Sequence, residues 1–194
     1  MTFVRNCGII FIKEEMEMRK IIACSAAVSL IFGIICAAVF KKYGIEVFFS
    51  LAVTFFTTLY HILMRLAVAY SVKALRKTKR DGLYFTLSRA ERNFYDTIRL
   101  KKWKRYAPTY DRELFSSEKH SYIEIMHNMT DAETGHGVIA VLSFVPLFFS
   151  KIFDGFMPFL ITSLLAAVFD LQFVAIQRYN KARISRILKK LNKI

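Results

Sequence analysis

Two residues of the stretch AETGH have the types and the spacing of a catalytic pair. Glu133 and His136 are three residues apart, so on a helix they share one face, where the carboxylate can orient the imidazole and raise its basicity. This arrangement predicts a general base that activates a hydroxyl. A metal site and a structural pair at a helix interface are the alternatives. Metal sites of this type combine two such motifs with further carboxylates, more than the apolar spans offer, so we predict neither a metal nor a cofactor.

A second polar cluster follows the last long apolar run of the chain. It contains Gln177, Arg178, Asn180 and Arg183 within seven residues. Guanidinium and amide groups can hold an anionic headgroup, a phosphate or a carboxylate, so the cluster predicts a binding site for a polar or anionic head. The alternative is an ordinary basic end of a membrane span that continues as an amphipathic surface helix.

The sequence KKWKRY contains the single tryptophan of the chain. An indole flanked by lysines is typical of the headgroup level of a membrane. We therefore expect Trp103 and Lys104 at the membrane surface, among the residues that bind substrate.

Three ionisable residues interrupt the apolar runs. His61 and Arg65 are four residues apart and share one helix face, and Asp170 lies in the last run. A charge at membrane depth costs a few kcal/mol, so such residues should face the protein interior, a wet cavity or the interface. We predict that Asp170 pairs with Arg65; the alternative for Arg65 is that its side chain extends to the membrane surface.

Long apolar runs dominate the composition and must position these residues. The chain has 194 residues, of which 55% are hydrophobic, and 19 are Phe. Four runs are long enough to cross a hydrocarbon core of about 30 Å as helices. They cover residues 21–40, 47–72, 138–153 and 157–176.

The distribution of Lys and Arg predicts how these runs are oriented. Residues 73–135 hold 14 of them, whereas the turn at 41–46 holds two and the turn at 151–157 holds one. Basic segments stay on the cytoplasmic side, so both termini and the central segment are expected there. The net charge of +14 is explained in this way, and no nucleic-acid partner is predicted.

The predicted fold is an all-α integral membrane four-helix bundle with cytoplasmic amphipathic helices between the second and third spans. Residues 1–72 form an N-terminal hairpin, 73–135 the basic segment, and 136–194 a C-terminal hairpin with a basic tail helix. In the central segment, Ser88 and Glu91 predict a capping box for a helix of about fifteen residues.

A second central helix is predicted from Ser117 toward Asp131. Gly135 and Gly137 are expected to break or bend it before the third span begins, and Pro146 lies within that span.

Three segments together resemble a known family. They are KKWK at 101–104, AE-x-x-H at 132–136, and QRYN-x-x-R-I at 177–184. In this order, over residues 94–190, the chain resembles the small bacterial membrane proteins of the glycosyl-4,4'-diaponeurosporenoate acyltransferase family. The family pattern usually reads QRYNRPR, whereas this chain has Lys181 and Ala182.

The resemblance implies a multi-pass protein of the bacterial cell membrane that transfers a fatty acyl chain to the sugar of a glycosylated carotenoid. We therefore expect an acyltransferase-like protein that binds a lipid or isoprenoid glycolipid and an acyl donor at the cytoplasmic surface. The alternative is a non-catalytic lipid-binding or assembly protein, in which the polar residues only hold helices together.

Overall fold

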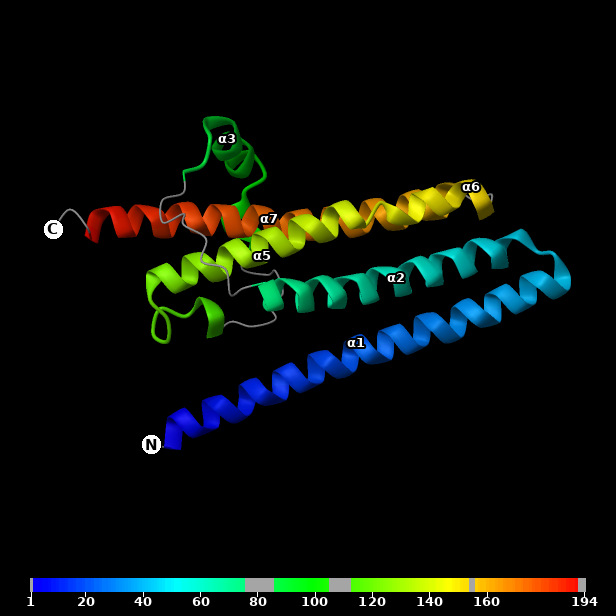
Figure 1. The fold of residues 1–194 in the computed structure, drawn as a ribbon, viewed down its shortest axis with the longest axis horizontal. Helices are drawn as coiled ribbons and strands as arrows, with labels where there is room; N and C mark the ends of the chain where they lie inside the picture. Colours follow the sequence, from blue (N-terminus) through cyan, green and yellow to red (C-terminus); the bar gives the residue numbers. More distant parts are fainter. Residues whose placement is uncertain (1, 76–85, 105–112, 154–155, 192–194) are drawn as a thin grey trace. The chain divides into compact units, whose positions relative to one another are not determined.

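The computed structural model describes residues 2–75, 86–104, 113–153 and 156–191. Every regular element within these ranges is helical, which confirms the predicted all-α class (Figure 1). Four helical stretches are long and apolar enough to cross a membrane, as predicted. They are Lys20–Tyr43, Glu46–Val72, Tyr122–Ile152 and Phe156–Leu191.

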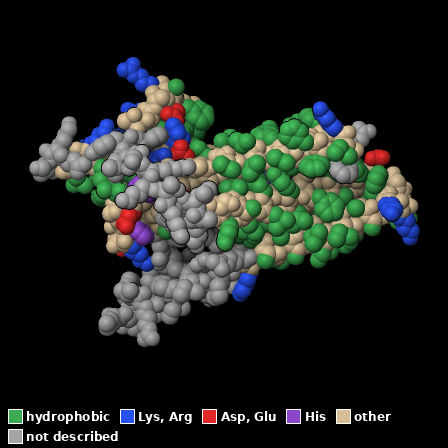
Figure 2. All heavy atoms as spheres, viewed as in Figure 1, with side chains coloured by type: hydrophobic (Ala, Val, Ile, Leu, Met, Phe, Trp, Pro, Cys, Tyr) green, Lys and Arg blue, Asp and Glu red, His purple; other side chains and the backbone are tan. Residues whose placement is uncertain are grey.

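Large hydrophobic side chains are exposed along these helices (Figure 2). Examples are Val141, Ile152 and Leu165, which are 72%, 72% and 67% exposed. An apolar surface of this extent is unfavourable in water and favourable against lipid. The chain is therefore a multi-pass membrane protein.

The chain packs as two compact units, and each is described by itself. The first comprises Met1–Ala67 and Leu142–Ala166, and the second comprises Val68–Val141 and Ala167–Ile194. The predicted division at residues 72 and 135 stays a prediction.

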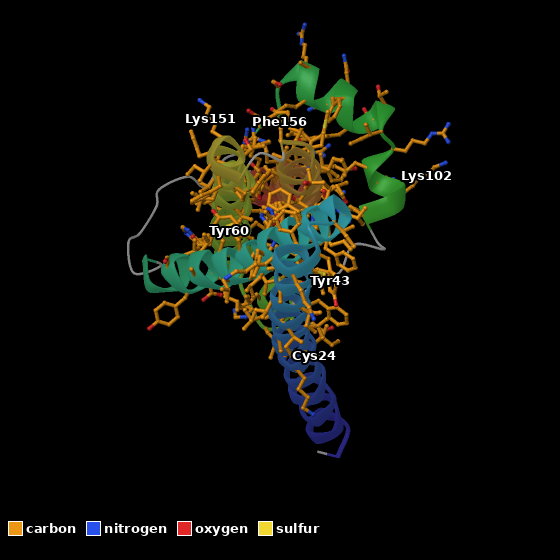
Figure 3. The ribbon with its side chains drawn as sticks, turned by 90° about the vertical axis from the view of Figure 1, so that its right-hand side faces the viewer. Cys24, Tyr43, Tyr60, Lys102, Lys151 and Phe156 are labelled. Carbon is orange, nitrogen blue, oxygen red and sulfur yellow. The ribbon has the colours of Figure 1, made fainter. Side chains whose placement is uncertain are left out.

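The first unit contains a hairpin of α1 (Thr2–Tyr43) and the first part of α2 (Glu46–Leu75). Gly44 joins the two helices with a φ of 67°, a conformation that glycine adopts without a steric penalty. The aromatic pair Phe32 and Phe55 lies between the helices, with ring centroids 5.5 Å apart. Figure 3 shows Cys24 and Tyr43 on α1 and Tyr60 on α2. The Tyr60 hydroxyl donates a 3.0 Å hydrogen bond to the Leu142 carbonyl.

The second unit begins its described central part with α3 (Arg89–Thr97). The predicted capping box is present, because the Ser88 side chain accepts from the Glu91 amide and the Glu91 side chain accepts from the Ser88 amide. The predicted length of fifteen residues is wrong. Arg99 adopts a left-handed conformation with a φ of 52°, which ends the helix, and a separate short helix α4 follows at Leu100–Trp103.

This break places Leu100 in a small core. Its side chain is 0% exposed and packs with Tyr95 and Ile176, which belong to α3 and to the last helix. Burying a leucine stabilises a fold by about 1.5–3 kcal/mol, more than the cost of about 1–2 kcal/mol for one left-handed residue. Tertiary packing thus overrides the continuous helix that the sequence predicted.

The helix α5 (Tyr122–Leu142) corrects two further predictions. It begins after Ser121, which forms a capping box with Glu124, and not at Ser117. It also runs through Gly135 and Gly137 without the predicted break, whereas the alternative of a bend stays a prediction. Each glycine costs a helix only about 1 kcal/mol, which does not outweigh the backbone hydrogen bonds of an apolar helix.

The third and fourth spans end differently. After α5, the 3₁₀ helix η3 (Val145–Phe149) has Pro146 in its first turn and leads into α6 (Ser150–Phe153). The last helix, α7 (Phe156–Leu191), contains 36 residues, about 54 Å of helix. The predicted fourth span and basic tail are therefore one continuous helix.

The close approach of α1 and α2 at Gly33 gives a stability prediction. A β-carbon there would lie 3.2 Å from ring carbons of Phe56, so Gly33→Val should destabilise the hairpin by about 1–3 kcal/mol. Thermal unfolding in detergent micelles measures the effect. Gly137→Ala is the control, because nothing lies within 4 Å of its added carbon. Equal melting temperatures for the two variants would contradict the packing described.

Candidate active site

A histidine and a buried carboxylate meet between α5 and α7 in the second unit. His136 Nδ1 lies 2.9 Å from Asp170 Oδ1. Asp170 is 0% exposed, whereas the His136 side chain is 30% exposed. Phe173 stacks on the imidazole, with centroids 4.6 Å apart and an interplanar angle of 16°. The ring is thus fixed on one side by a hydrogen bond and on one face by an aromatic ring.

The predicted pairing of Glu133 with His136 is wrong. Within the described ranges, Glu133 bonds to Arg178 and pairs with Lys181, and it makes no hydrogen bond to His136. The i, i+3 spacing does put both residues on the side of α5 that contacts α7, but each side chain reaches across to that helix. The residue that orients the imidazole is therefore Asp170.

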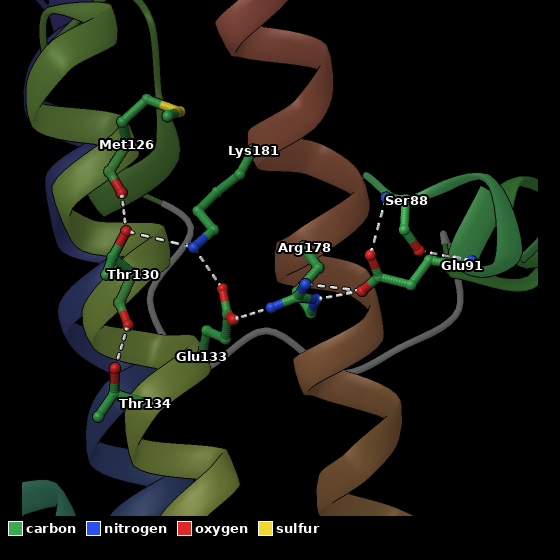
Figure 4. Close-up of polar contacts among 8 residues, drawn as sticks. All are labelled: Ser88, Glu91, Met126, Thr130, Glu133, Thr134, Arg178 and Lys181. Atoms are coloured by element: carbon green, nitrogen blue, oxygen red, sulfur yellow. Dashed lines mark hydrogen bonds and ion pairs between the residues drawn. The ribbon is translucent and has the colours of Figure 1, made fainter. Parts of the chain in front are cut away.

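An ion-pair network joins α3, α5 and α7, and its residue on α5 lies one turn before His136 (Figure 4). We call it the clamp and define it by Glu91, Glu133, Arg178 and Lys181. Arg178 Nη1 lies 2.8 Å from Glu133 Oε1, and its Nε and Nη2 lie 2.8 and 2.6 Å from Glu91 Oε1. Lys181 pairs with the second Glu133 oxygen and lies 3.5 Å from the Thr130 hydroxyl.

These contacts set α5 and α7 antiparallel. His136 contacts Asp170, Glu133 contacts Arg178, and Thr130 contacts Lys181. The residue numbers thus decrease along α5 while they increase along α7. We call His136 and Asp170 the dyad. The clamp fixes the register of the two helices one turn from the dyad along α5 and two to three turns from it along α7.

The clamp is electrically balanced. Its two carboxylates and two cations have formal charges that cancel. On α3, the pKa of Glu91 is lowered, first by the hydrogen bond from the Ser88 amide and then by Arg178, against an opposing effect of burial. Arg178 was predicted to hold an anionic substrate, but its guanidinium already binds two carboxylates. Its position is better suited to joining helices than to binding a ligand.

The remaining predicted binding residues lie beyond the clamp on α7. Asn180 Oδ1 accepts a 2.7 Å hydrogen bond from Lys104 Nζ, which also lies 4.7 Å from the centroid of the Tyr179 ring. Arg183 is exposed on the same helix. Gln177 Oε1 is buried without a hydrogen-bond partner among the described residues. The structure thus brings Lys104 to Asn180 and Tyr179 of the C-terminal cluster, and their joint role in binding substrate stays a prediction.

Trp103 ends α4, and its side chain lies outside the described part of the structure. His61 and Arg65 belong to the first unit. His61 is 4% exposed, and Arg65 Nη2 lies 3.4 Å from the Ala166 carbonyl. The predicted pairing of Arg65 with Asp170 would join the two units and stays a prediction.

The sequence contained a signal for the dyad. Asp170 and His136 both fall within about two turns of the predicted cytoplasmic boundary, one near the end of the fourth span and one at the start of the third. Glu91 carried no comparable signal, since its role as a cap explained it fully. In the described ranges, no three His, Cys, Asp or Glu side chains come together in a group that could hold a metal ion.

Comparison with known proteins gives one result. A family model described as glycosyl-4,4'-diaponeurosporenoate acyltransferase matches residues 73–190, more than half of the chain. The match contains every residue of the dyad and the clamp, and it extends further toward the N-terminus than the predicted resemblance at 94–190. No curated protein and no solved structure gives a significant match to this chain.

The clamp predicts that the two neighbouring arginines of α7 differ in their contribution to stability. Arg178→Ala leaves two carboxylates without their shared cation and should lower the free energy of unfolding by about 2 kcal/mol, a value reduced for partial solvent exposure. Arg183→Ala removes an exposed charge and should change it by less than about 0.5 kcal/mol. Unfolding in detergent measures both. Similar losses in the two variants would show that the clamp does not stabilise the packing of α3, α5 and α7.

Proposed function

Because the chain belongs to the glycosyl-4,4'-diaponeurosporenoate acyltransferase family, we propose that it esterifies a sugar hydroxyl of a lipid-linked or isoprenoid glycoside. The observation that supports catalysis is the 2.9 Å contact between His136 Nδ1 and the fully buried Asp170. In this proposal His136 is the general base and Asp170 is the positioning residue.

The contact with Asp170 favours the imidazole tautomer that a general base needs, with the proton on Nδ1. Nδ1 donates its proton to the Asp170 carboxylate, so in the neutral ring Nε2 has the free lone pair. Nε2 makes no hydrogen bond to another described residue. It can therefore accept the proton of a sugar hydroxyl while the hydroxyl oxygen attacks an acyl carbonyl.

The carboxylate has a second role during the reaction. When Nε2 takes the proton, the ring becomes positively charged, and the charge of Asp170 stabilises it. Because Asp170 is shielded from water, this interaction is weakly screened. The protonated ring then returns its proton to the leaving group, which restores the neutral base.

The membrane supplies the acceptor and its apolar tail in this proposal. We assign the dyad and the clamp to the cytoplasmic side of a bacterial cell membrane, with both termini on that side. The support is the excess of Lys and Arg between the second and third spans and after the fourth. The amphipathic helix α3 is assigned to the same surface, where the acceptor sugar would meet His136 while its isoprenoid part stays among the spans.

A non-catalytic function as a lipid-binding or assembly protein is the second candidate. The clamp favours this non-catalytic function, because its balanced ion pairs hold helices together and leave no net charge for a ligand. The free Nε2 of His136 has no role in that function. Substitution of the dyad therefore distinguishes the two candidates.

Catalysis by the dyad predicts that His136→Ala and Asp170→Asn each lower the rate of ester formation by about 10²–10⁴-fold. The measurement is mass spectrometry of acylated glycoside in membranes of cells that make the glycosyl carotenoid acceptor. His127→Ala is the matched control, because this exposed histidine lies on the same helix α5 and should leave the rate unchanged. Full activity in His136→Ala protein would exclude the proposed base.

A further inference from the structure

A cationic site lies beyond the clamp, at the junction of α4 and α7. Lys104 follows α4 directly, and its ammonium donates to Asn180 and lies over the Tyr179 ring. On α7, Tyr179 and Asn180 precede Arg183 by four and three residues, so the three side chains share one face. We call this group the Lys104–Arg183 site.

The cations of the Lys104–Arg183 site differ from those of the clamp in their partners. Arg178 and Lys181 are paired with carboxylates. Lys104 and Arg183 form no ion pair with any carboxylate in the described ranges. The pKa of Lys104 is lowered by burial, and then by the nearby positive charges of Arg183 and Lys101. A half-buried cation with other cations nearby is unfavourable, and an anion bound among them removes this repulsion.

The position of this site along α7 restricts which anion fits. Asn180 is ten residues beyond Asp170, about 15 Å along the helix axis, and Arg183 is about 20 Å beyond it. The phosphate of a glycerophospholipid is only a few bonds from its ester carbonyls, so it cannot lie here while its acyl group reaches His136. A phosphopantetheine thioester has about a dozen bonds between phosphate and sulfur, the backbone length of about four extended residues, or ~14 Å.

We propose that the Lys104–Arg183 site binds the phosphate of an acyl phosphopantetheine thioester, the acyl donor of the reaction. The inference rests on the proposed function and names its second substrate. The phosphate lies between Lys104 and Arg183, and the pantetheine arm runs along α7 past the clamp toward the dyad. Coenzyme A and an acyl-carrier protein are the two sources of this group.

The transfer step is balanced with this donor. The oxygen of the sugar hydroxyl forms a bond to the acyl carbon, and the bond from that carbon to sulfur breaks. The hydroxyl proton passes to His136 Nε2 and then to the departing thiolate, which leaves as a thiol. No oxidant, reductant or metal is required.

Binding to the purified full-length protein in detergent micelles tests the proposal without turnover. The probes are 4'-phosphopantetheine and pantetheine, which differ only in the phosphate. We expect the wild type to bind the phosphorylated probe about tenfold more tightly or better, because the charge-assisted contacts of Lys104 and Arg183 reach only the phosphate. Lys104→Ala and Arg183→Ala should each remove most of this preference, whereas Arg183→Lys should retain part of it.

Lys102→Ala is the matched control, because it removes the same charge from an exposed position of α4 (Figure 3). It should keep the preference for the phosphorylated probe. Helical circular dichroism of each variant confirms folding. Coenzyme A and a carrier protein bearing phosphopantetheine, added in separate arms, identify the source by which of them displaces the probe.

Three results would overturn the proposal. They are equal affinities of the wild type for both probes, equal losses in Lys102→Ala and Lys104→Ala protein, and direct binding of a short-chain phosphatidylglycerol without binding of phosphopantetheine. Binding should also persist in His136→Ala protein. Such binding in a wild-type protein that forms no ester would support the phosphate site and refute the proposed acyl transfer. The two failures are therefore distinguishable.

Discussion

The buried carboxylate of Asp170 is the constraint on which the second unit depends. A carboxylate that is 0% exposed on an apolar helix costs several kcal/mol unless a partner and hydrogen bonds compensate. One compensating contact comes from His136, and it places α5 beside α7 at this level. Once these helices are antiparallel neighbours, Glu133, one turn from His136 on α5, meets Arg178 and Lys181, about two and three turns beyond Asp170 on α7. The clamp and the dyad are thus two consequences of one helix contact.

The charged residues of α7 have three different kinds of partner in succession. Asp170 contacts His136, Arg178 joins α3 to α5, and Arg183 lies one turn beyond Asn180, which binds Lys104; neither Lys104 nor Arg183 pairs with a described carboxylate. A cation with two carboxylate partners gains little from a ligand, because binding would require breaking existing ion pairs. A cation that lies near other cations gains more free energy from binding an anionic ligand than a cation with two carboxylate partners does. This contrast explains why the residues of one basic helix end need not all bind substrate.

Much of the fold followed from composition and pattern. The long apolar runs predicted four spans, because backbone hydrogen bonding in lipid leaves helices as the simplest solution. The start of α3 was predictable because a capping box is local in sequence. The break at Arg99 and the unbroken α5 through Gly135 were not, because packing and the apolar setting of the helix decide each of them.

In the candidate site too, features that depend on nearby residues were predictable, whereas contacts between helices were not. The sequence identified Glu133, His136 and Asp170 as unusual, but the spacing of three residues favoured the wrong partner for His136. Spacing states which side chains share a face and does not state whether they contact each other or a neighbouring helix. The partner of Arg178 on α3 was also hidden, since a contact across 87 residues has no pattern in a single sequence.

The position of the proton on the His136 ring distinguishes an imidazole that Asp170 orients as a base from one that only joins two helices. Nitrogen-15 NMR of ring-labelled histidine, in protein reconstituted in micelles and assigned by comparison with His136→Ala, reports which ring nitrogen carries the proton. We predict that the His136 ring carries its proton at Nδ1 and has a free lone pair at Nε2, and that this preference weakens in Asp170→Asn protein. A ring protonated at Nε2, or a tautomer unaffected by Asp170→Asn, would contradict the account.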